Sequence, residues 1–262
     1  MSFTDIINET FNGWGLLVTL VHNESARTVM MLVGALVTMV AAYLLGSLNF
    51  AIILSHKEYN QDIRTFGSKN AGMTNMMRIY GKKAAFLTLL GDMLKAVVAA
   101  LIGYVLLGMC GAYIAGLFCI IGHMFPAYYG FRGGKGVVTA ATSILMCDPI
   151  VFLLLFACFV LIVLATKYIS LGSVMCMLLY PIILDRVSKL FTQHTSPFII
   201  FSILIAALVI VKHHENIKRL LEGKENKFSF RKSKPTTEVK AEEANTAKEN
   251  ANALPQKAKK KK

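Results

Sequence analysis

The fold class is decided by residues 96–131, AVVAALIGYVLLGMCGAYIAGLFCIIGHMFPAYYGF, which contain no Lys, Arg, Asp or Glu. About 20 apolar residues cross the hydrocarbon core of a bilayer as a helix. This stretch therefore has room for the end of one helix, a Gly-Met-Cys-Gly turn at 108–111 and a second helix. Further stretches that lack all four charged residue types lie at 28–56, 149–166, 168–184 and 190–211.

The composition agrees with a membrane protein. Hydrophobic residues make up 55% of the 262 residues and charged residues only 16%, against roughly 25% charged residues in an ordinary soluble domain. We therefore predict an all-α integral membrane protein with seven transmembrane helices. The predicted spans lie at about 30–55, 82–107, 112–129, 134–147, 149–166, 169–186 and 197–214.

The basic residues of the short loops set the expected orientation. The loops at 56–83 and 130–135 and the turn at 167 contain nine Lys and Arg residues, whereas the opposite side contains about three. Cytoplasmic loops carry the excess of Lys and Arg in membrane proteins. We expect a multi-pass protein of the cell membrane, with its N-terminus outside, and with its C-terminus and these loops in the cytoplasm.

The two ends of the chain differ from the expected membrane domain at 30–222. Residues 1–29 carry an apolar stripe at helical spacing, which favours an extracytoplasmic segment lying in the membrane interface. Residues 223–262 contain 12 Lys and Arg and 5 Asp and Glu, so they carry +7 of the formal net charge of +13. Because these residues include few large apolar side chains, we expect a disordered, Lys-rich cytoplasmic tail.

The first cytoplasmic loop has the composition of an anion site. Residues 62–83 read DIRTFGSKNAGMTNMMRIYGKK, in which hydroxyl, amide and glycine residues precede an expected helix start. A glycine-rich turn that leads into a helix offers backbone N–H groups to an anion, and the planar fork of Arg78 matches a phosphate. A polar turn on the membrane surface is the alternative interpretation.

The second cytoplasmic loop places a lysine among glycines. Residues 122–140 read GHMFPAYYGFRGGKGVVTA, so Gly133 and Gly134 precede Lys135 directly before an expected helix. A nucleotide-binding P-loop is disfavoured, because its first glycine position holds Tyr129 and its Ser/Thr position holds Gly136. Small residues here let the backbone approach a ligand closely, while Lys135 supplies a positive charge.

Shorter polar motifs fall on the same side of the predicted topology. Ser170 lies at the start of the sixth span, and His213 and Asn216 lie at the end of the seventh. A histidine at a helix C-terminus can be charged and bind an anion, although an interface anchor is its commoner role. Within the second span, Asp92 and Lys95 are spaced i, i+3, which favours an ion pair over a catalytic role.

Together, these motifs resemble those of the bacterial acyl-phosphate-dependent glycerol-3-phosphate acyltransferases, the PlsY family. The resemblance covers residues 35–222 in order and rests on GSKNAGMTNMMR (67–78), DMLK (92–95), GHMFPAYYGFRGGKGVVT (122–139), SLGS (170–173) and HHENI (213–217). The sequence departs from the family pattern at Lys69, Met73 and Ala96, where Gly, Ala and Gly are usual.

The resemblance implies a seven-helix enzyme. Its expected reaction transfers a fatty acyl group from acyl phosphate to the sn-1 hydroxyl of glycerol 3-phosphate, giving lysophosphatidic acid and phosphate in phospholipid biosynthesis. The implied catalytic residues are Ser68, Arg78, Lys135 and His213. The implied substrate-binding residues are Asn70, Thr74, Asn75, Gly133, Gly134, Ser170 and Asn216.

Within that set, the resemblance implies two subsites. Ser68, Thr74 and Arg78 would line the acyl-phosphate site, and Lys135, Ser170 and His213 would hold glycerol 3-phosphate. The expected partners are these two substrates, membrane lipids and an enzyme that forms acyl phosphate. No nucleic acid, cofactor or metal is expected.

Two alternatives stay open at this point. No His is followed five positions later by Asp, so a His-x-x-x-x-Asp motif is absent. A substrate phosphate oxygen is then the favoured base for the attacking hydroxyl, and His213 is the alternative. The other function class is a membrane transporter of phosphate or glycerol phosphate, for which internal repeats and a midplane site are typical. The halves of this sequence show no repeat.

Overall fold

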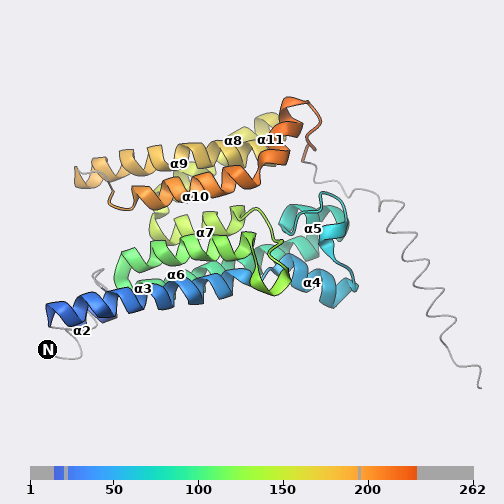
Figure 1. The fold of residues 1–262 in the computed structure, drawn as a ribbon. Coiled ribbons are helices and arrows are strands. Elements are labelled where there is room, and N and C mark those ends of the chain that lie inside the picture. Colours follow the sequence, from blue (N-terminus) through green and yellow to red (C-terminus); the bar gives the residue numbers. More distant parts are fainter. Residues whose placement is uncertain (1–14, 21–22, 194–195, 229–262) are drawn as a thin grey trace, which may run out of the picture. The chain divides into compact units, whose positions relative to one another are not determined.

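The computed structural model describes residues 15–20, 23–193 and 196–228, and every regular element among them is a helix (Figure 1). The all-α prediction is confirmed for these residues. The helices are α2 Leu16–Leu20, α3 Glu24–Ser47, α4 Phe50–Tyr59, η2 Ile63–Thr65, α5 Met73–Ile79, α6 Lys82–Met124, η3 Ala127–Tyr129, α7 Val137–Cys147, α8 Pro149–Thr166, α9 Ile169–Thr192, α10 Ile199–Lys212 and α11 His214–Leu221. Most of the predicted interfacial segment and tail lies outside the described residues.

Helix α6 consists of two helical arms. Its backbone leaves the helical conformation at Leu107 and Gly108, and Gly108 has a φ of 61°, which glycine adopts without strain. A Cβ atom on Gly103 would lie 2.1 Å from the carbonyl oxygen of Gly111. Residues eight apart in a straight helix are about 12 Å apart along the axis, so the chain turns back here. This reversal agrees with the predicted turn at 108–111.

Several helices are long and apolar enough to cross a membrane. These are the stretches Glu24–Tyr59, Lys82–Tyr129, Pro149–Thr166 and Ile169–Phe191, and α10 with α11 forms a fifth that is bent by 59°. The two arms of α6 count once in this set. Helix α7 has 11 residues and is about 16 Å long. It begins three residues later than the predicted segment 134–147, because Gly136 has a φ of 75° and lies outside the helix.

Small residues bring α3 close to the second arm of α6. A Cβ atom on Gly46 would lie 2.2 Å from the carbonyl oxygen of Cys119, and one on Gly122 would lie 2.2 Å from that of Tyr43. Close backbone approach through small residues is typical of helix pairs in membranes, where apolar side chains gain little by leaving lipid. This contact fixes the end of α3 against the end of α6.

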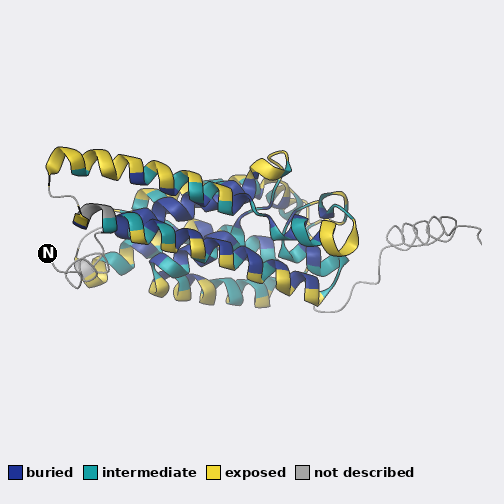
Figure 2. Cartoon of the chain, turned by 90° about the horizontal axis from the view of Figure 1, so that it is seen from below, coloured by how far each residue is buried: buried dark blue, intermediate teal, exposed yellow. Residues whose placement is uncertain are grey.

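Apolar side chains cover the outer faces of the helices and also fill the interior. Helices α7–α10 enclose a cluster that includes Ile144, Val151, Tyr180 and Ile205, each at most 2% exposed. Leucines such as Leu36, Leu153 and Leu161 are exposed on the outside. Figure 2 shows buried residues in the interior and exposed residues along the outer helix faces. A soluble protein rarely exposes so much apolar surface, so these faces suit lipid.

A buried lysine joins the end of α3 to the end of α6. The Lys95 ammonium lies 2.7 Å from the Asp92 carboxylate and 2.9 Å from Nδ1 of His123. It also donates to the carbonyl oxygens of Gly46 (3.0 Å) and Leu48 (2.8 Å) at the C-terminal end of α3. The last carbonyls of a helix lack partners within the helix, so this lysine completes α3 while its charge is balanced by Asp92. The contacts agree with the ion-pair interpretation.

We predict that Gly46→Val lowers the thermal unfolding temperature of the detergent-solubilised protein by several degrees. Its side chain would overlap the Cys119 carbonyl, and overpacking of this kind costs about 1–3 kcal/mol. Leu44→Val alters an exposed side chain on the same helix and should leave the unfolding temperature unchanged. Equal unfolding temperatures for Gly46→Val and the wild type would contradict the close α3–α6 packing.

Candidate active site

Asn75 organises the first loop. Its side chain is 1% exposed, and its Oδ1 accepts a hydrogen bond from the Ser68 N–H (3.0 Å). Its Nδ2 donates to the carbonyl oxygens of Ile63 (3.2 Å) and Phe66 (3.0 Å). The Asn75 amide thus fastens the loop after η2 to the first turn of α5. Asn75 was predicted to bind substrate, and the structure gives it these contacts within the loop.

The other predicted residues of this loop lie nearer its surface. Ser68 is exposed, whereas Asn70, Thr74 and Arg78 are half-buried. Arg78 lies in the last turn of α5. Its charge is close enough to lower the pKa of Lys135, so the end of α5 lies near the second loop.

The second loop packs against the end of α6 through its glycines. The N–H of Gly134 donates to the His123 carbonyl (3.1 Å), and that of Gly133 donates to the Met124 carbonyl (3.2 Å). A Cβ atom on Gly134 would lie 2.2 Å from Nε2 of His123 and 2.4 Å from the Ala71 carbonyl oxygen. The small size of both glycines therefore serves the packing of the two loops on each other and on His123.

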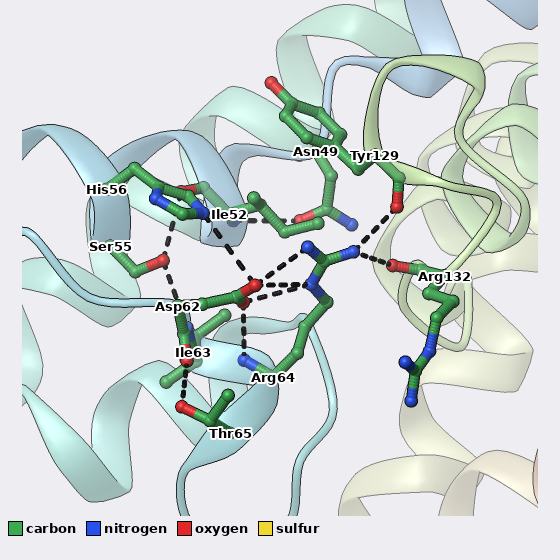
Figure 3. Close-up of polar contacts among 10 residues, drawn as sticks. All are labelled: Asn49, Ile52, Ser55, His56, Asp62, Ile63, Arg64, Thr65, Tyr129 and Arg132. Carbon is green, nitrogen blue, oxygen red and sulfur yellow. Dashed lines mark hydrogen bonds and ion pairs between the residues drawn. The ribbon is translucent and has the colours of Figure 1, made fainter.

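Arg64 ties the two loops together (Figure 3). Its guanidinium hydrogen-bonds the Asp62 carboxylate, with Nη2 2.8 Å from Oδ2. Its Nη1 donates across to the carbonyl oxygens of Tyr129 (2.7 Å) and Arg132 (3.0 Å) in the second loop. The hydrogen bonds from Arg64 hold the pKa of Asp62 below its usual value. The sequence assigned Arg64 only a role in topology, and the neighbouring Asp62 is the signal that was available.

Residues from three separate segments meet around one carboxylate. Lys135 of the second loop donates a hydrogen bond to Oδ1 of Asn216 on α11. Nδ2 of Asn216 donates to Oε1 of Glu225 (2.6 Å), and so does the hydroxyl of Ser170 at the start of α9 (2.9 Å). Arg219 donates from Nε to the other Glu225 oxygen (2.8 Å).

The structure thus brings together Lys135, Ser170 and Asn216, three of the predicted site residues, and adds two residues that the sequence did not single out. Arg219 lies on α11, one turn beyond Asn216. Glu225 lies in the segment that the sequence assigned to the disordered tail. Residues 223–228 instead follow α11 in the described structure, and the Phe228 N–H donates to the Lys167 carbonyl (2.7 Å).

His213 completes the group at the junction of α10 and α11. It is buried, and its Nδ1 lies 2.7 Å from the Val209 carbonyl oxygen. A carbonyl oxygen can only accept, so Nδ1 carries the proton and Nε2 of the neutral ring holds the lone pair. Electrostatic coupling of His213 to Lys135 and Glu225 places it beside the carboxylate cluster.

The cluster carries an excess of positive charge. Burial lowers the pKa of the Lys135 ammonium to about 8, an effect that Glu225 opposes and that Arg219 and Arg78 reinforce. Lys135 thus faces two further cations and one carboxylate, which leaves an electrostatic preference for an added anion. Among the described residues, no group of three or more His, Cys, Asp and Glu side chains is arranged to hold a metal ion.

Fold and site together define the class: a helical membrane protein with a cationic cluster where its helix ends and loops meet. The chain belongs to the glycerol-3-phosphate acyltransferase family, because the family model described as Glycerol-3-phosphate acyltransferase matches residues 36–223.

Similar proteins carry the same description. Glycerol-3-phosphate acyltransferase of Thermoanaerobacter sp. (strain X514) is 41% identical over 194 residues, which cover 74% of this chain and 96% of that protein. The protein of the same name from Clostridioides difficile (strain 630) is 41% identical over 199 residues, covering 74% of this chain and 95% of its own length.

Solved structures of PlsY (YgiH), an integral membrane glycerol 3-phosphate acyltransferase, share the fold. Its glycerol 3-phosphate form matches with a TM-score of 0.67 and 35% identity, covering 74% of this chain and 96% of PlsY. Its lysophosphatidic acid form matches with a TM-score of 0.65 and 34% identity, covering 75% and 96%. This fold and the apolar helices make the present chain a membrane-embedded protein.

We predict that Arg64→Ala speeds amide hydrogen exchange in residues 62–72 by roughly 10- to 100-fold. Hydrogen bonds to charged groups contribute about 1.5–3 kcal/mol, and this substitution removes those that join the two loops. Lys57→Ala changes an exposed lysine before the same loop and should leave exchange there as it is. Unaltered exchange in Arg64→Ala would show that Arg64 does not hold the loops together.

Proposed function

We propose that this protein transfers a fatty acyl group from acyl phosphate to the sn-1 hydroxyl of glycerol 3-phosphate, releasing lysophosphatidic acid and phosphate. Membership of the glycerol-3-phosphate acyltransferase family supports the reaction. The observation that carries it is the cluster in which Lys135, Asn216 and Ser170 meet beside His213. Two phosphate-bearing substrates require the positive charge that this cluster and Arg78 supply.

The seven-span topology is part of the proposal. Helix α3, the two arms of α6, and helices α7, α8, α9 and α10 would form the seven spans. The ends that carry the site motifs also carry most of the loop lysines and arginines, which supports a cytoplasmic site in the cell membrane. The acyl chain would then enter from the lipid, and glycerol 3-phosphate would enter from the cytosol.

The site divides between the two substrates. Ser68 and Thr74 would receive acyl phosphate together with Arg78, whose planar fork matches a phosphate group. Asn70 would line this part, and Asn75 would shape its loop. Lys135, Ser170, His213 and Asn216 would receive glycerol 3-phosphate. Gly133 and Gly134 would fix the position of Lys135 by packing the second loop onto His123.

The proposed chemistry needs positioning and charge more than a strong acid. The sn-1 oxygen attacks the acyl carbon, and the bond from that carbon to the phosphate oxygen breaks. Inorganic phosphate leaves, and the proton of the attacking hydroxyl passes to a substrate phosphate oxygen. Arg78 and Lys135 stabilise the phosphate charges, which is the kind of electrostatic stabilisation that contributes most in many enzymes. Because acyl phosphate is a reactive mixed anhydride, an enzyme that forms it is the expected upstream partner.

The assay that tests the function follows phosphate release from palmitoyl phosphate and glycerol 3-phosphate by the purified protein. Arg78→Ala and Lys135→Ala should each lower kcat/KM by roughly 10- to 100-fold, because a charged hydrogen bond contributes about 1.5–3 kcal/mol. Arg132→Ala is the matched control, since only the backbone carbonyl of Arg132 contacts Arg64. Wild-type protein that releases no phosphate but carries glycerol 3-phosphate across a vesicle membrane would refute the transferase in favour of a transporter.

The choice of base has its own test. If a substrate phosphate takes the proton, His213→Gln should raise the KM for glycerol 3-phosphate and leave the shape of the pH–rate profile intact. His214→Gln, which alters the exposed neighbouring histidine, should behave like the wild type. A His213→Gln variant that lost kcat alone, together with one limb of the profile, would instead identify His213 as the base.

A further inference from the structure

The segment that follows α11 returns to the site by a defined turn. The N–H of Gly223 donates to the Leu220 carbonyl (3.1 Å), and that of Lys224 donates to the Arg219 carbonyl (2.8 Å). With Gly223 at a φ of 68°, this is the Schellman arrangement that ends many helices. We call residues 224–228 the C-terminal strap. Its far end is held at the turn between α8 and α9 by the hydrogen bond from the Phe228 N–H to the Lys167 carbonyl.

The strap carries one acid into the cationic cluster. The Glu225 side chain is 8% exposed, and its two oxygens accept hydrogen bonds from Asn216, Ser170 and Arg219. Burial alone would raise the pKa of Glu225, but these hydrogen bonds outweigh it and the pKa is lowered. A carboxylate held ionised at this depth needs such partners.

The chemistry of the contacts fixes the orientation of Asn216. A carboxylate only accepts hydrogen bonds and an ammonium only donates them. Because Asn216 lies between Glu225 and Lys135, its NH2 group must face Glu225 and its carbonyl oxygen must face Lys135. Lys135 then uses one of its three protons on Asn216, which leaves the others for a phosphate.

The same reasoning applies to Ser170. Its single hydroxyl proton goes to Glu225, so the lone pairs of its oxygen face away from the carboxylate. Such an oxygen accepts a hydrogen bond from a substrate hydroxyl and does not donate one to a phosphate oxygen. Glu225 thereby determines which part of glycerol 3-phosphate Ser170 can bind.

Glu225 also offsets the charges that face Lys135. Those charges come from Arg78 on α5 and Arg219 on α11, with the ionisable ring of His213 at the end of α10. Both arginines favour loss of the Lys135 proton, and Glu225 is the acid that favours its retention.

We propose that Glu225 is a positioning residue of the active site, which orients Asn216 and Ser170 toward glycerol 3-phosphate and holds its negative charge on the far side of Asn216 from Lys135. This inference rests on the proposed acyl transfer. A competing idea is that the Glu225 carboxylate occupies the place of the substrate phosphate and must be displaced before binding. The two ideas predict opposite effects of removing its charge.

The test measures kcat/KM for glycerol 3-phosphate from about pH 6 to about pH 9 at saturating palmitoyl phosphate, which reports ionisations of the enzyme before glycerol 3-phosphate binds. In the wild type it should fall as the pH rises through about 8, where Lys135 loses its proton. Glu225→Gln keeps an oxygen that accepts from Asn216 and Ser170 but removes the charge. Its midpoint should move about one unit lower, so that activity lost at pH 8 is largely recovered at pH 6.

Glu225→Asp makes the complementary change. It keeps the charge but withdraws it by one methylene from Asn216 and Ser170, so the KM for glycerol 3-phosphate should rise about tenfold with the midpoint of the wild type. Glu222→Gln removes the neighbouring acid, which pairs with Lys224 at the surface, and should match the wild type in both respects. The thermal unfolding temperature confirms that each variant is folded.

Three results would overturn the proposal. One is a Glu225→Gln midpoint equal to that of the wild type, and the second is a higher kcat/KM at every pH, which would indicate displacement by substrate phosphate. The third is a normal KM in Glu225→Asp, and this variant decides the question if Glu225→Gln does not fold. Failure of the proposed function itself would appear differently, as a wild type that transfers no acyl group at any pH.

Discussion

The fold depends on one ammonium group in its interior. Lys95 joins the last carbonyls of α3 to His123 near the end of α6, and Asp92 balances its charge. An ion at this depth is costly unless it is paired, so these contacts favour the arrangement in which the helix ends meet at Lys95. The second loop in turn packs on His123 through Gly134. The position of Lys135 at the site is therefore set by a charge pair inside the helices.

The loops carry a second set of charges, which is arranged differently. Arg64 and Asp62 neutralise each other while they lock the two loops. The cluster around Lys135 is left with more cations than acids, and its one carboxylate is held by three donors. The charges that join the two loops are thus balanced locally, whereas the cluster around Lys135 keeps an excess of positive charge.

The sequence predicted the parts that depend on local pattern. Long apolar stretches without charged residues predicted the membrane helices. The glycine turn at 108–111 was sufficient to predict that α6 divides into two arms. Helix α7 was predicted too long because the loop uses Gly134 and Gly136 for tertiary contacts that no local pattern records. The shared side of the membrane placed the motifs of Lys135, Ser170 and Asn216 together, and the family resemblance implied their roles. Glu225 was missed because an acid among lysines and asparagines resembles a solvated tail, and only the turn at Gly223 brings it back.

The C-terminal strap has a consequence for how the protein is made. Helices α3 to α11 precede Glu225 in the chain, so all of them are made while the last contact of the cluster is still missing. Synthesis must pass Phe228 before the strap can reach Lys167. The helices and the last contact of the cluster are therefore completed at different points of synthesis. A chain truncated after α11 would keep every helix and yet would hold Lys135, Asn216 and Ser170 without the acid that accepts hydrogen bonds from Asn216 and Ser170.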